Sequence, residues 1–450
     1  MTFKKYINHY QENFRLAVPV VIAHIGQMLT NIADNVMTGH YSTLSLSASA
    51  FMNSVFIIVM VFGIGFAQGL TPLIGKAIGQ KELQRTGHLL RHSLLLNTAV
   101  VAILLLILNN TTPLLFHMGQ VDEVVREGIP YYKVINWSLL PMIVFFSFKQ
   151  FAEGNASTKP AMIITLGANV LNVIINYILI FGKWGAPEMG LIGAGIATLI
   201  ARVTMAIAMA AYILYTPRFK EHLKGFYERS ISSTLLWDLI KVSFPIALQV
   251  VMEVAAFAIG GIMVGQLGKN EIAAHQIAIS LSSVTFMMAN GLSAAITIRN
   301  SGAHGQNNYT EARDISWAGL HMVIIFMLFS SVVFILGSEW MASLYTPDLT
   351  VVKMAIPMIG IAALFQLFDG IQVLSFGALR GISDVKNPTI IAFIAYWLVS
   401  LPTGYLLAFH SPLRELGVWV GFLAGLSTAS VLLTLRFHKI TRKMQQLYTV

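Results

Sequence analysis

The chain of 450 residues contains no cysteine, which excludes disulfide bonds, iron–sulfur clusters and thiol catalysis. Charged residues are also scarce. They make up 11% of the sequence, whereas soluble domains carry about 25%. In contrast, 56% of the residues are hydrophobic. A chain this apolar cannot cover its surface with polar groups in water, so the composition excludes both a soluble enzyme and a disordered chain.

The hydrophobic residues gather in runs of about 20 residues or more, the length of an α-helix that crosses a bilayer. We predict an all-α integral membrane protein whose twelve transmembrane helices lie at residues 15–38, 46–75, 89–109, 129–152, 160–182, 190–215, 237–265, 271–300, 315–337, 350–378, 388–409 and 416–436. The first run is too long for a cleavable signal peptide, and we interpret it as a helix of the mature chain.

The distribution of Lys and Arg predicts the orientation of these helices. If the N-terminus is cytoplasmic, 22 of the 29 basic residues lie on the cytoplasmic side, six lie outside, and Arg202 falls within a span. Such a bias is typical of a membrane protein with both termini in the cytoplasm. The net charge of +9 is then spread over short loops, which argues against a nucleic-acid partner.

The sequence repeats itself at half its length. Pro19 and Pro245 are 226 residues apart, and the same offset pairs Gly65 with Gly291 and Thr71 with Thr297. The pattern predicts two parallel six-helix bundles, at residues 1–226 and 227–450, joined by a polar cytoplasmic linker at about 216–236. In transporters, such repeats pack around a cavity near the middle of the membrane.

Only three acidic residues fall deep within the predicted helices, namely Asp34, Glu253 and Asp369. Each would cost roughly 2.5–3.5 kcal/mol at a helix centre facing lipid, so we expect them to face a wet cavity or polar partners. A buried acid held by a neighbouring Arg or amide is the alternative. Arg202 needs a partner as well, and a structural ion pair is the simplest explanation for it.

Polar side chains accompany the three acids at helical spacing. The stripes comprise Gln27, Asn31 and Asp34; Gln249 and Glu253; Gln366, Asp369 and Gln372; Asn172 and Asn176; and, on the eighth span, Gln276. Hydrogen bonds between helices explain many of these amides. They do not explain three carboxylates, which need a proton or a cation in such a setting. With amide and hydroxyl oxygens beside it, a carboxylate forms a hard-oxygen site that suits Na⁺.

Several motifs of catalysis are absent. The closest approach to a P-loop, GLTPLIGKA at 69–77, has the wrong spacing, and the patterns G-x-S-x-G and H-E-x-x-H do not occur. We therefore predict a transporter rather than an enzyme, with no cofactor, which is either driven by an ion gradient or passive.

The chain resembles the multidrug and toxic compound extrusion (MATE) transporters over nearly its whole length. The resemblance rests on residues 19–50 and their repeat at 245–280, together with 166–182, 189–198 and 376–388. The acids at Glu253 and Asp369 are similar to those of the NorM-like branch. The resemblance implies two six-helix bundles that form a V around a central cavity, in a monomer of the bacterial inner membrane that exports cationic drugs and dyes in exchange for Na⁺ or H⁺.

The resemblance also implies roles for particular residues. In the first bundle, Asp34, Asn172, Asn176 and Thr198 match the positions that bind the cation, and in the second Glu253 and Asp369 do. A Na⁺ site is thus implied at Asp34, Glu253 and Asp369. The substrate cavity is expected to include Gln27, Asn31, Gln249, Gln276, Phe365 and Gln366. Phe365 stands where some relatives have Tyr, and Asn176 where some have Asp.

Two other functions remain open. A flippase for a lipid-linked precursor would need several Arg and Lys in its cavity, whereas only Arg202 lies in mid-span. An exporter of an endogenous metabolite is not separated from a multidrug exporter by the sequence.

Overall fold

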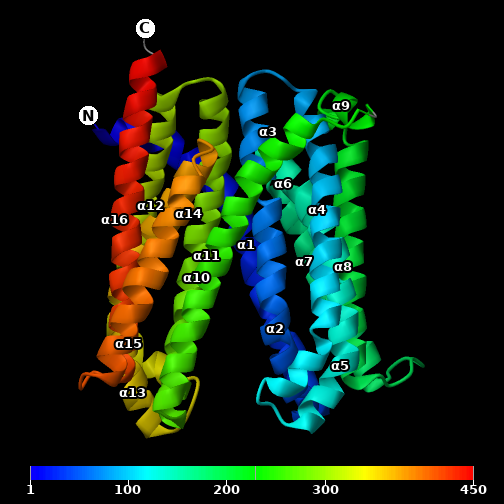
Figure 1. Ribbon diagram of the computed structural model, residues 1–450, viewed down its shortest axis with the longest axis vertical. Coiled ribbons are helices and arrows are strands. Elements are labelled where there is room, and N and C mark those ends of the chain that lie inside the picture. The colour runs from blue at the N-terminus through cyan, green and yellow to red at the C-terminus, as the bar shows by residue number, and fades with distance from the viewer. Residues whose placement is uncertain (1, 229, 449–450) are drawn as a thin grey trace. The chain divides into compact units, whose positions relative to one another are not determined.

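The computed structural model describes residues 2–228 and 230–448. Met1, Arg229, Thr449 and Val450, which the predicted bundles and linker include, lie outside the described residues. All regular secondary structure in this part of the chain is helical (Figure 1). Twelve helical stretches are long and apolar enough to cross a membrane, and each coincides with a predicted span. The prediction of an all-α protein with twelve transmembrane helices is therefore confirmed.

The helices occur in the following order: α1 (Thr2–Tyr41), α2 (Thr43–Ala67), α3 (Leu70–Gly79), α4 (Arg85–Asn110), η1 (Thr112–His117), α5 (Asp122–Trp137), α6 (Leu139–Gly154), α7 (Lys159–Phe181), α8 (Gly190–Tyr215), η2 (Pro217–Phe219), α9 (Lys224–Tyr227), α10 (Ser233–Leu267), α11 (Lys269–Gly305), α12 (Tyr309–Ser343), α13 (Leu349–Gly381), α14 (Lys386–Phe393), η3 (Ile394–Ser400), α15 (Leu401–Phe409) and α16 (Glu415–Tyr448). Three of the spans are interrupted: α2 continues into α3, α5 into α6, and α14 through η3 into α15.

Most spans are longer than the predicted hydrophobic runs. The first stretch, Lys5–Tyr41, has 37 residues, which corresponds to about 55 Å at 1.5 Å per residue. The hydrocarbon core of a bilayer is about 30 Å thick. The ends of such a helix therefore extend into the headgroup region and beyond, where polar residues are tolerated.

The chain divides into two compact units, which differ from the predicted bundles at their ends. One unit comprises Met1–Val21 and Leu248–Val450, and the other comprises Ile22–Ala247. We call them the C-terminal unit and the N-terminal unit. Each boundary lies two residues after the proline of a repeated pair, Pro19 in α1 and Pro245 in α10. The start of each of these helices thus belongs to a different unit from the rest of the helix.

Two glycines show how the helix segments next to these boundaries pack within each unit. A Cβ atom on Gly65 of α2 would lie 2.9 Å from the Cα atom of Ala247, within the N-terminal unit. A Cβ atom on Gly291 of α11 would collide with Val21 of α1, within the C-terminal unit. Gly65 and Gly291 are 226 residues apart, as are Val21 and Ala247. Each unit therefore contains the same close helix contact, and each needs a residue without a side chain there.

A second contact occurs once within each unit. The Thr71 hydroxyl donates to the Gln150 carbonyl at 3.2 Å, and the Thr297 hydroxyl donates to the Gly377 carbonyl at 3.0 Å. The threonines are 226 residues apart and their acceptors 227. The duplication seen in the sequence is thus a duplication of tertiary contacts.

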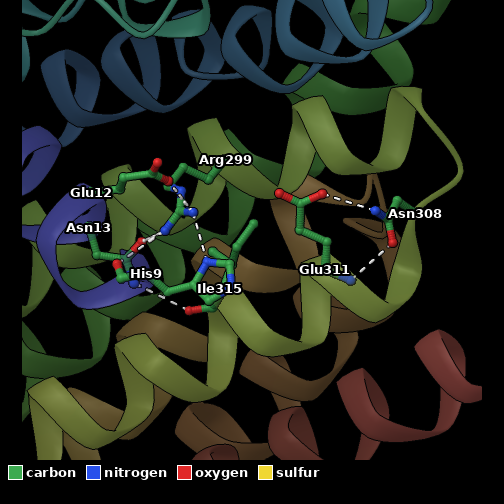
Figure 2. A network of polar contacts seen from close by, with 7 residues as sticks. All are labelled: His9, Glu12, Asn13, Arg299, Asn308, Glu311 and Ile315. Atoms are coloured by element: carbon green, nitrogen blue, oxygen red, sulfur yellow. Dashed lines mark hydrogen bonds and ion pairs between the residues drawn. The ribbon is translucent and has the colours of Figure 1, made fainter. Parts of the chain in front are cut away.

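The start of α1 is held in the C-terminal unit by polar contacts (Figure 2). The Arg299 guanidinium of α11 forms an ion pair with Glu12 and donates to the Asn13 side-chain oxygen at 2.6 Å. Asn13 in turn donates to the Ile315 carbonyl of α12 at 3.3 Å. Nearby, the amino group of Lys5 lies 2.7 Å from the carboxylate of Asp314. These contacts explain why the first residues of the chain belong with its C-terminal half.

The linker is folded against the N-terminal unit rather than extended. Phe219 is fully buried and packs on Phe151, with 5.7 Å between the ring centroids. A Cβ atom on Gly225 would collide with the Gln84 carbonyl, so the linker backbone lies directly on the start of α4. The side chain of Arg218 donates to the Asn155 carbonyl at 2.9 Å. The polar composition of the linker gives no indication that Phe219 and Gly225 hold it against the rest of the unit.

Candidate ion and substrate site

The residues predicted to bind a cation in the first bundle meet in the N-terminal unit. Asp34 of α1 accepts a hydrogen bond from the Asn176 amide of α7 at 2.5 Å. In one orientation, the Asn172 amide accepts from Asn176 at 3.2 Å. In the other, it donates to Asp34 at 3.0 Å and accepts from the backbone N–H of Thr198 at 3.3 Å. Asp34, Asn172, Asn176 and Thr198 therefore form one cluster, which we call the Asp34 cluster.

Thr198 contributes its backbone to this cluster. Its hydroxyl donates to the Ala194 carbonyl of its own helix at 3.0 Å. Asn176 is fully buried and its side-chain oxygen has no hydrogen-bond partner in the structure. The Asp34 cluster thus contains a carboxylate and a buried amide oxygen that lacks a donor.

Arg202 does not form the ion pair that the sequence suggested. Among the described residues, its guanidinium donates to the Ser138 hydroxyl at 2.6 Å and lies 5.5 Å from the centre of the Phe56 ring. A longer contact, of 3.9 Å, reaches the sulfur of Met60. Arg202 follows Thr198 by one helical turn, and its charge acts electrostatically on Asp34 without direct contact.

The C-terminal unit contains a second cluster around Glu253 of α10. The Tyr396 hydroxyl donates to the Glu253 carboxylate at 3.0 Å, and the Gln372 amide donates to the same oxygen at 3.2 Å. The Gln372 amide also lies 2.5 Å from the Tyr396 hydroxyl. Gln372 is fully buried, and its side-chain oxygen has no hydrogen-bond partner. We call these residues, with Asp369, the Glu253 cluster.

Asp369 lies on α13, one turn before Gln372, and only 4% of its surface is exposed. Within the described residues it forms no hydrogen bond or ion pair, but its charge and that of Glu253 act on each other. Arg380 of α13 donates to the Gln249 side-chain oxygen at 3.3 Å and interacts electrostatically with Glu253. The cluster therefore combines two carboxylates with one nearby guanidinium.

Sequence reasoning did not identify Tyr396 as a site residue. It lies in η3, a π-helical segment that ends at Ser400, two residues before Pro402. Proline lacks an N–H group and its ring clashes with the carbonyl four residues earlier, so the turn before it widens. The sequence offered one signal, a tyrosine followed six residues later by a proline within an apolar run. That signal does not reveal the shift in helical register that directs the Tyr396 hydroxyl toward Glu253, which only the structure shows.

The remaining residues predicted to line the cavity have different surroundings within their own units. Gln27, Asn31 and Gln276 have exposed side chains. Gln366 is fully buried and donates to the Ser331 hydroxyl of α12 at 3.2 Å, which is a contact between helices. Phe365 packs edge-on against Phe257 and Trp419, with ring centroids 6.1 and 5.7 Å apart. Its surroundings are therefore aromatic.

Besides Asp34, Glu253, Asp369 and Arg202, which the predicted spans contain, further charged side chains lie near the ends of the observed spans. Glu153, at the end of α6, is 4% exposed and lies 3.6 Å from the amino group of Lys149. Arg380 lies within the span Leu349–Gly381, beyond the predicted end of that helix at residue 378. Both residues were assigned to loops because the predicted spans were too short.

Within the described residues, no three His, Asp or Glu side chains come together as a metal site, so a metal ion would also need amide or hydroxyl oxygens.

Twelve membrane-length helices in two repeats, each with a buried cluster of acid and amide side chains, define a membrane transporter built by duplication. The chain belongs to the MatE family, whose sequence model matches residues 19–178 and 245–406. It is 32% identical over 443 residues to a protein of Idiomarina loihiensis named probable multidrug resistance protein NorM, covering 96% of this chain and 94% of that one. A protein of the same name from Xylella fastidiosa is 33% identical over 430 residues, covering 95% and 92%.

Solved structures share the fold at lower identity. A MATE protein in a bent conformation superimposes with a TM-score of 0.91 at 19% identity, covering 99% of this chain and 98% of that one. A eukaryotic MATE transporter gives a TM-score of 0.88 at 20% identity, with coverage of 98% and 99%. The resemblance to MATE transporters and to NorM is thus confirmed.

Proposed function

We propose that this protein exports cationic organic compounds across a bacterial inner membrane in exchange for H⁺ or Na⁺. It would act as a monomer with both termini in the cytoplasm and with no cofactor. The name of the curated relatives, multidrug resistance protein, supports export of drugs. The V-shaped arrangement of two bundles, divided near residue 226, is part of the same proposal.

One observation carries the exchange of cations. Beside an acid in each unit, a fully buried amide oxygen has no donor: Asn176 beside Asp34, and Gln372 beside Glu253. Burying a polar group without a partner is costly. The described residues include other such atoms, for example in Asn136 and Asn300, but the oxygens of Asn176 and Gln372 are distinguished by the carboxylate beside them. A bound Na⁺, or a proton on the neighbouring carboxyl, would satisfy such an oxygen. The two clusters are therefore suited to bind and release a small cation.

The charges of the two clusters differ. Asp34 has one arginine, Arg202, within electrostatic reach. Glu253 has one arginine, Arg380, but also a second carboxylate, Asp369. The Glu253 cluster is therefore the more negative, and we assign the main coupling ion to Glu253 and Asp369 and a second site to Asp34. Negative clusters would also attract cationic substrates, which disfavours the flippase alternative because that substrate carries an anionic headgroup.

Coupling would follow from competition for these carboxylates. A ligand shifts a conformational equilibrium only by its different affinity for the two states. If the ion binds the outward-open state more tightly, it favours that state and displaces the substrate there. Gln27, Asn31, Gln249, Gln276, Phe365 and Gln366 remain proposed substrate contacts.

Ethidium efflux from proteoliposomes tests this proposal. We expect Glu253→Gln and Asp369→Asn each to lower gradient-driven efflux at least about tenfold, because each removes a charge that exists only to bind a cation. Glu339→Gln, which neutralises an exposed acid of α12, is the matched control and should leave efflux unchanged. Imposing a pH gradient or a Na⁺ gradient separately identifies the coupling ion. Wild-type efflux in either site variant would overturn the assignment.

A further inference from the structure

A cavity of about 900 Å³ opens at the end of the N-terminal unit, where α4, η1 and α5 meet. Within this unit, it lies at the opposite end from the linker helix α9 (Figure 1). The residues that define its chemistry are Asn109, Phe116, His117, Arg126, Lys133 and Trp137. The cavity is thus basic and aromatic, and it belongs to neither acid cluster.

The basic residues share one face of α5. Arg126, Pro130, Lys133 and Trp137 follow each other at i, i+4, i+7 and i+11, and all four side chains are exposed. The other faces of the helix are packed, so this face alone remains open. Arg126 and Lys133 are separated by two turns, about 10.5 Å along the axis. Side chains of their length can reach one ligand placed between them.

In the described part of the chain, no carboxylate forms an ion pair with this face of α5. Asp122 and Glu123 lie one turn before Arg126, but within the described residues neither forms an ion pair with it. Glu127 points to another partner, since it accepts a hydrogen bond from the Ser45 hydroxyl at 2.9 Å. Among the described residues, Arg126 and Lys133 therefore have no ion-pair partner, although Asp122 and Glu123 lie on the preceding turn of α5.

An apolar stripe of α4 leads into the cavity. Leu95, Ile103 and Leu106 are exposed by 47%, 58% and 63%, and they precede Asn109 on the same face of the helix. Beside the cavity, Trp137 is 58% exposed. Exposed tryptophans next to basic residues are typical of the level at which membrane headgroups lie.

We propose that this cavity binds the phosphate headgroup of an anionic phospholipid. Arg126 and Lys133 hold the phosphate from two turns of α5, Trp137 lies at the level of the glycerol backbone, and an acyl chain follows the stripe on α4. A free phosphate would use the two charges but would have no use for the apolar stripe. The contiguity of charge, aromatic ring and stripe therefore favours a lipid.

Native mass spectrometry of the delipidated full-length protein tests the site with three probes: phosphatidylglycerol, phosphatidylcholine and inorganic phosphate. We expect one phosphatidylglycerol to bind on the order of tenfold more tightly than phosphatidylcholine, because two cations face its net charge. Arg126→Gln with Lys133→Gln should abolish this preference. Arg126→Lys with Lys133→Arg should retain it, which shows that the protein tolerates change at both positions.

The matched control is Lys183→Gln with Lys353→Gln, which removes the same charge from two other exposed lysines and should keep the preference. Equal loss in this control would overturn the proposal, since nonspecific charge would then suffice. Competition by inorganic phosphate at the concentration of the lipid would overturn the lipid assignment. The measurement involves no transport, so its outcome is independent of the proposed exchange of cations.

Discussion

At the scale of single residues, the proposed function rests on a few buried polar groups that lack partners among the described residues. Asp369 is buried without a hydrogen bond or ion pair among the described residues, and the oxygens of Asn176 and Gln372 are buried without donors. Contacts between helices satisfy part of such an amide: Gln366 donates to the Ser331 hydroxyl, although its own side-chain oxygen is also buried without a partner. Unsatisfied atoms that gather around carboxylates are better explained by a ligand that comes and goes.

Tyr396 offers a test of this interpretation that leaves every charge in place. Tyr396→Phe removes one of the two donors to the Glu253 carboxylate. A hydrogen bond to a charged group contributes about 1.5–3 kcal/mol, so we expect gradient-driven efflux to fall on the order of tenfold. The rate of ethidium efflux from proteoliposomes is the measurement.

Tyr405→Phe is the control for this change. Tyr405 lies on the adjacent helix α15, is 48% exposed and packs on the rings of Phe409 and His410; among the described residues its hydroxyl forms no hydrogen bond. Its hydroxyl should be dispensable. If Tyr396→Phe transports as fast as Tyr405→Phe, the hydrogen bond to Glu253 has no part in coupling.

At the scale of elements, hydropathy predicted the spans because a bilayer imposes a minimum apolar length on any helix that crosses it. It did not predict their ends. Glu153 and Arg380 lie beyond the predicted spans, yet Glu153 is buried and Arg380 is half-buried. Apolar content measures contact with lipid, whereas burial of an end residue depends on which helix packs beside it.

As with the spans, part of the candidate site could be predicted from the sequence and part could not. Helical spacing and the family resemblance placed Asp34, Asn172, Asn176 and Thr198 in one set, and the structure brings them together. The same reasoning could not find Tyr396, because a π-helical segment shifts the register on which spacing depends. Nor could it find the contact of Gln366 with Ser331 of α12, because spacing alone does not say which neighbour a helix face meets.

The linker shows an element whose stability we expect to depend on pH. Burial lowers the pKa of His222 below its ordinary value of 6.5, and the positive charge of Arg218 acts in the same direction. His222 is therefore neutral in the folded linker, where its Nδ1 lies 3.1 Å from the Thr86 hydroxyl. The unfolded linker takes up a proton below about pH 6.5, so docking is fully stable above that pH and weakens as the pH falls.

Hydrogen exchange of the amides in residues 216–228, corrected for intrinsic rates, measures this effect. We expect weaker protection at pH 5.5 than at pH 7.5. His222→Gln should remove the dependence on pH, whereas His410→Gln, which changes a histidine of the C-terminal unit just after α15, should preserve it. Protection that does not change with pH in the wild-type protein would contradict the assignment to His222.

At the scale of the whole molecule, duplication explains features that no single helix does. The contacts of Gly65 with Ala247 and of Gly291 with Val21 are the same contact made twice, and each joins the second helix of one repeat to the first helix of the other. The compact units therefore begin at residues 22 and 248 rather than at the ends of the repeats. Gene duplication determines where each repeat begins in the sequence, whereas helix packing determines which residues belong to each compact unit.

Orientation in the membrane is the prediction that belongs to this scale, and the lack of cysteine makes it simple to test. Gln120, between η1 and α5, is exposed and expected outside, whereas Gln446, near the end of α16, is exposed and expected in the cytoplasm. We expect a membrane-impermeant maleimide to label Gln120→Cys in intact cells. It should label Gln446→Cys only after the cells are permeabilised.

Each variant serves as the control for the other, because both replace an exposed glutamine and neither competes with a native thiol. The opposite labelling pattern would reverse the topology and place the basic linker outside the cell. That result would contradict the charge bias, since Lys and Arg resist translocation across an energised membrane. It would also move the cavity at Arg126 and Lys133 to the cytoplasmic leaflet, so the same pair of variants decides which leaflet supplies the lipid.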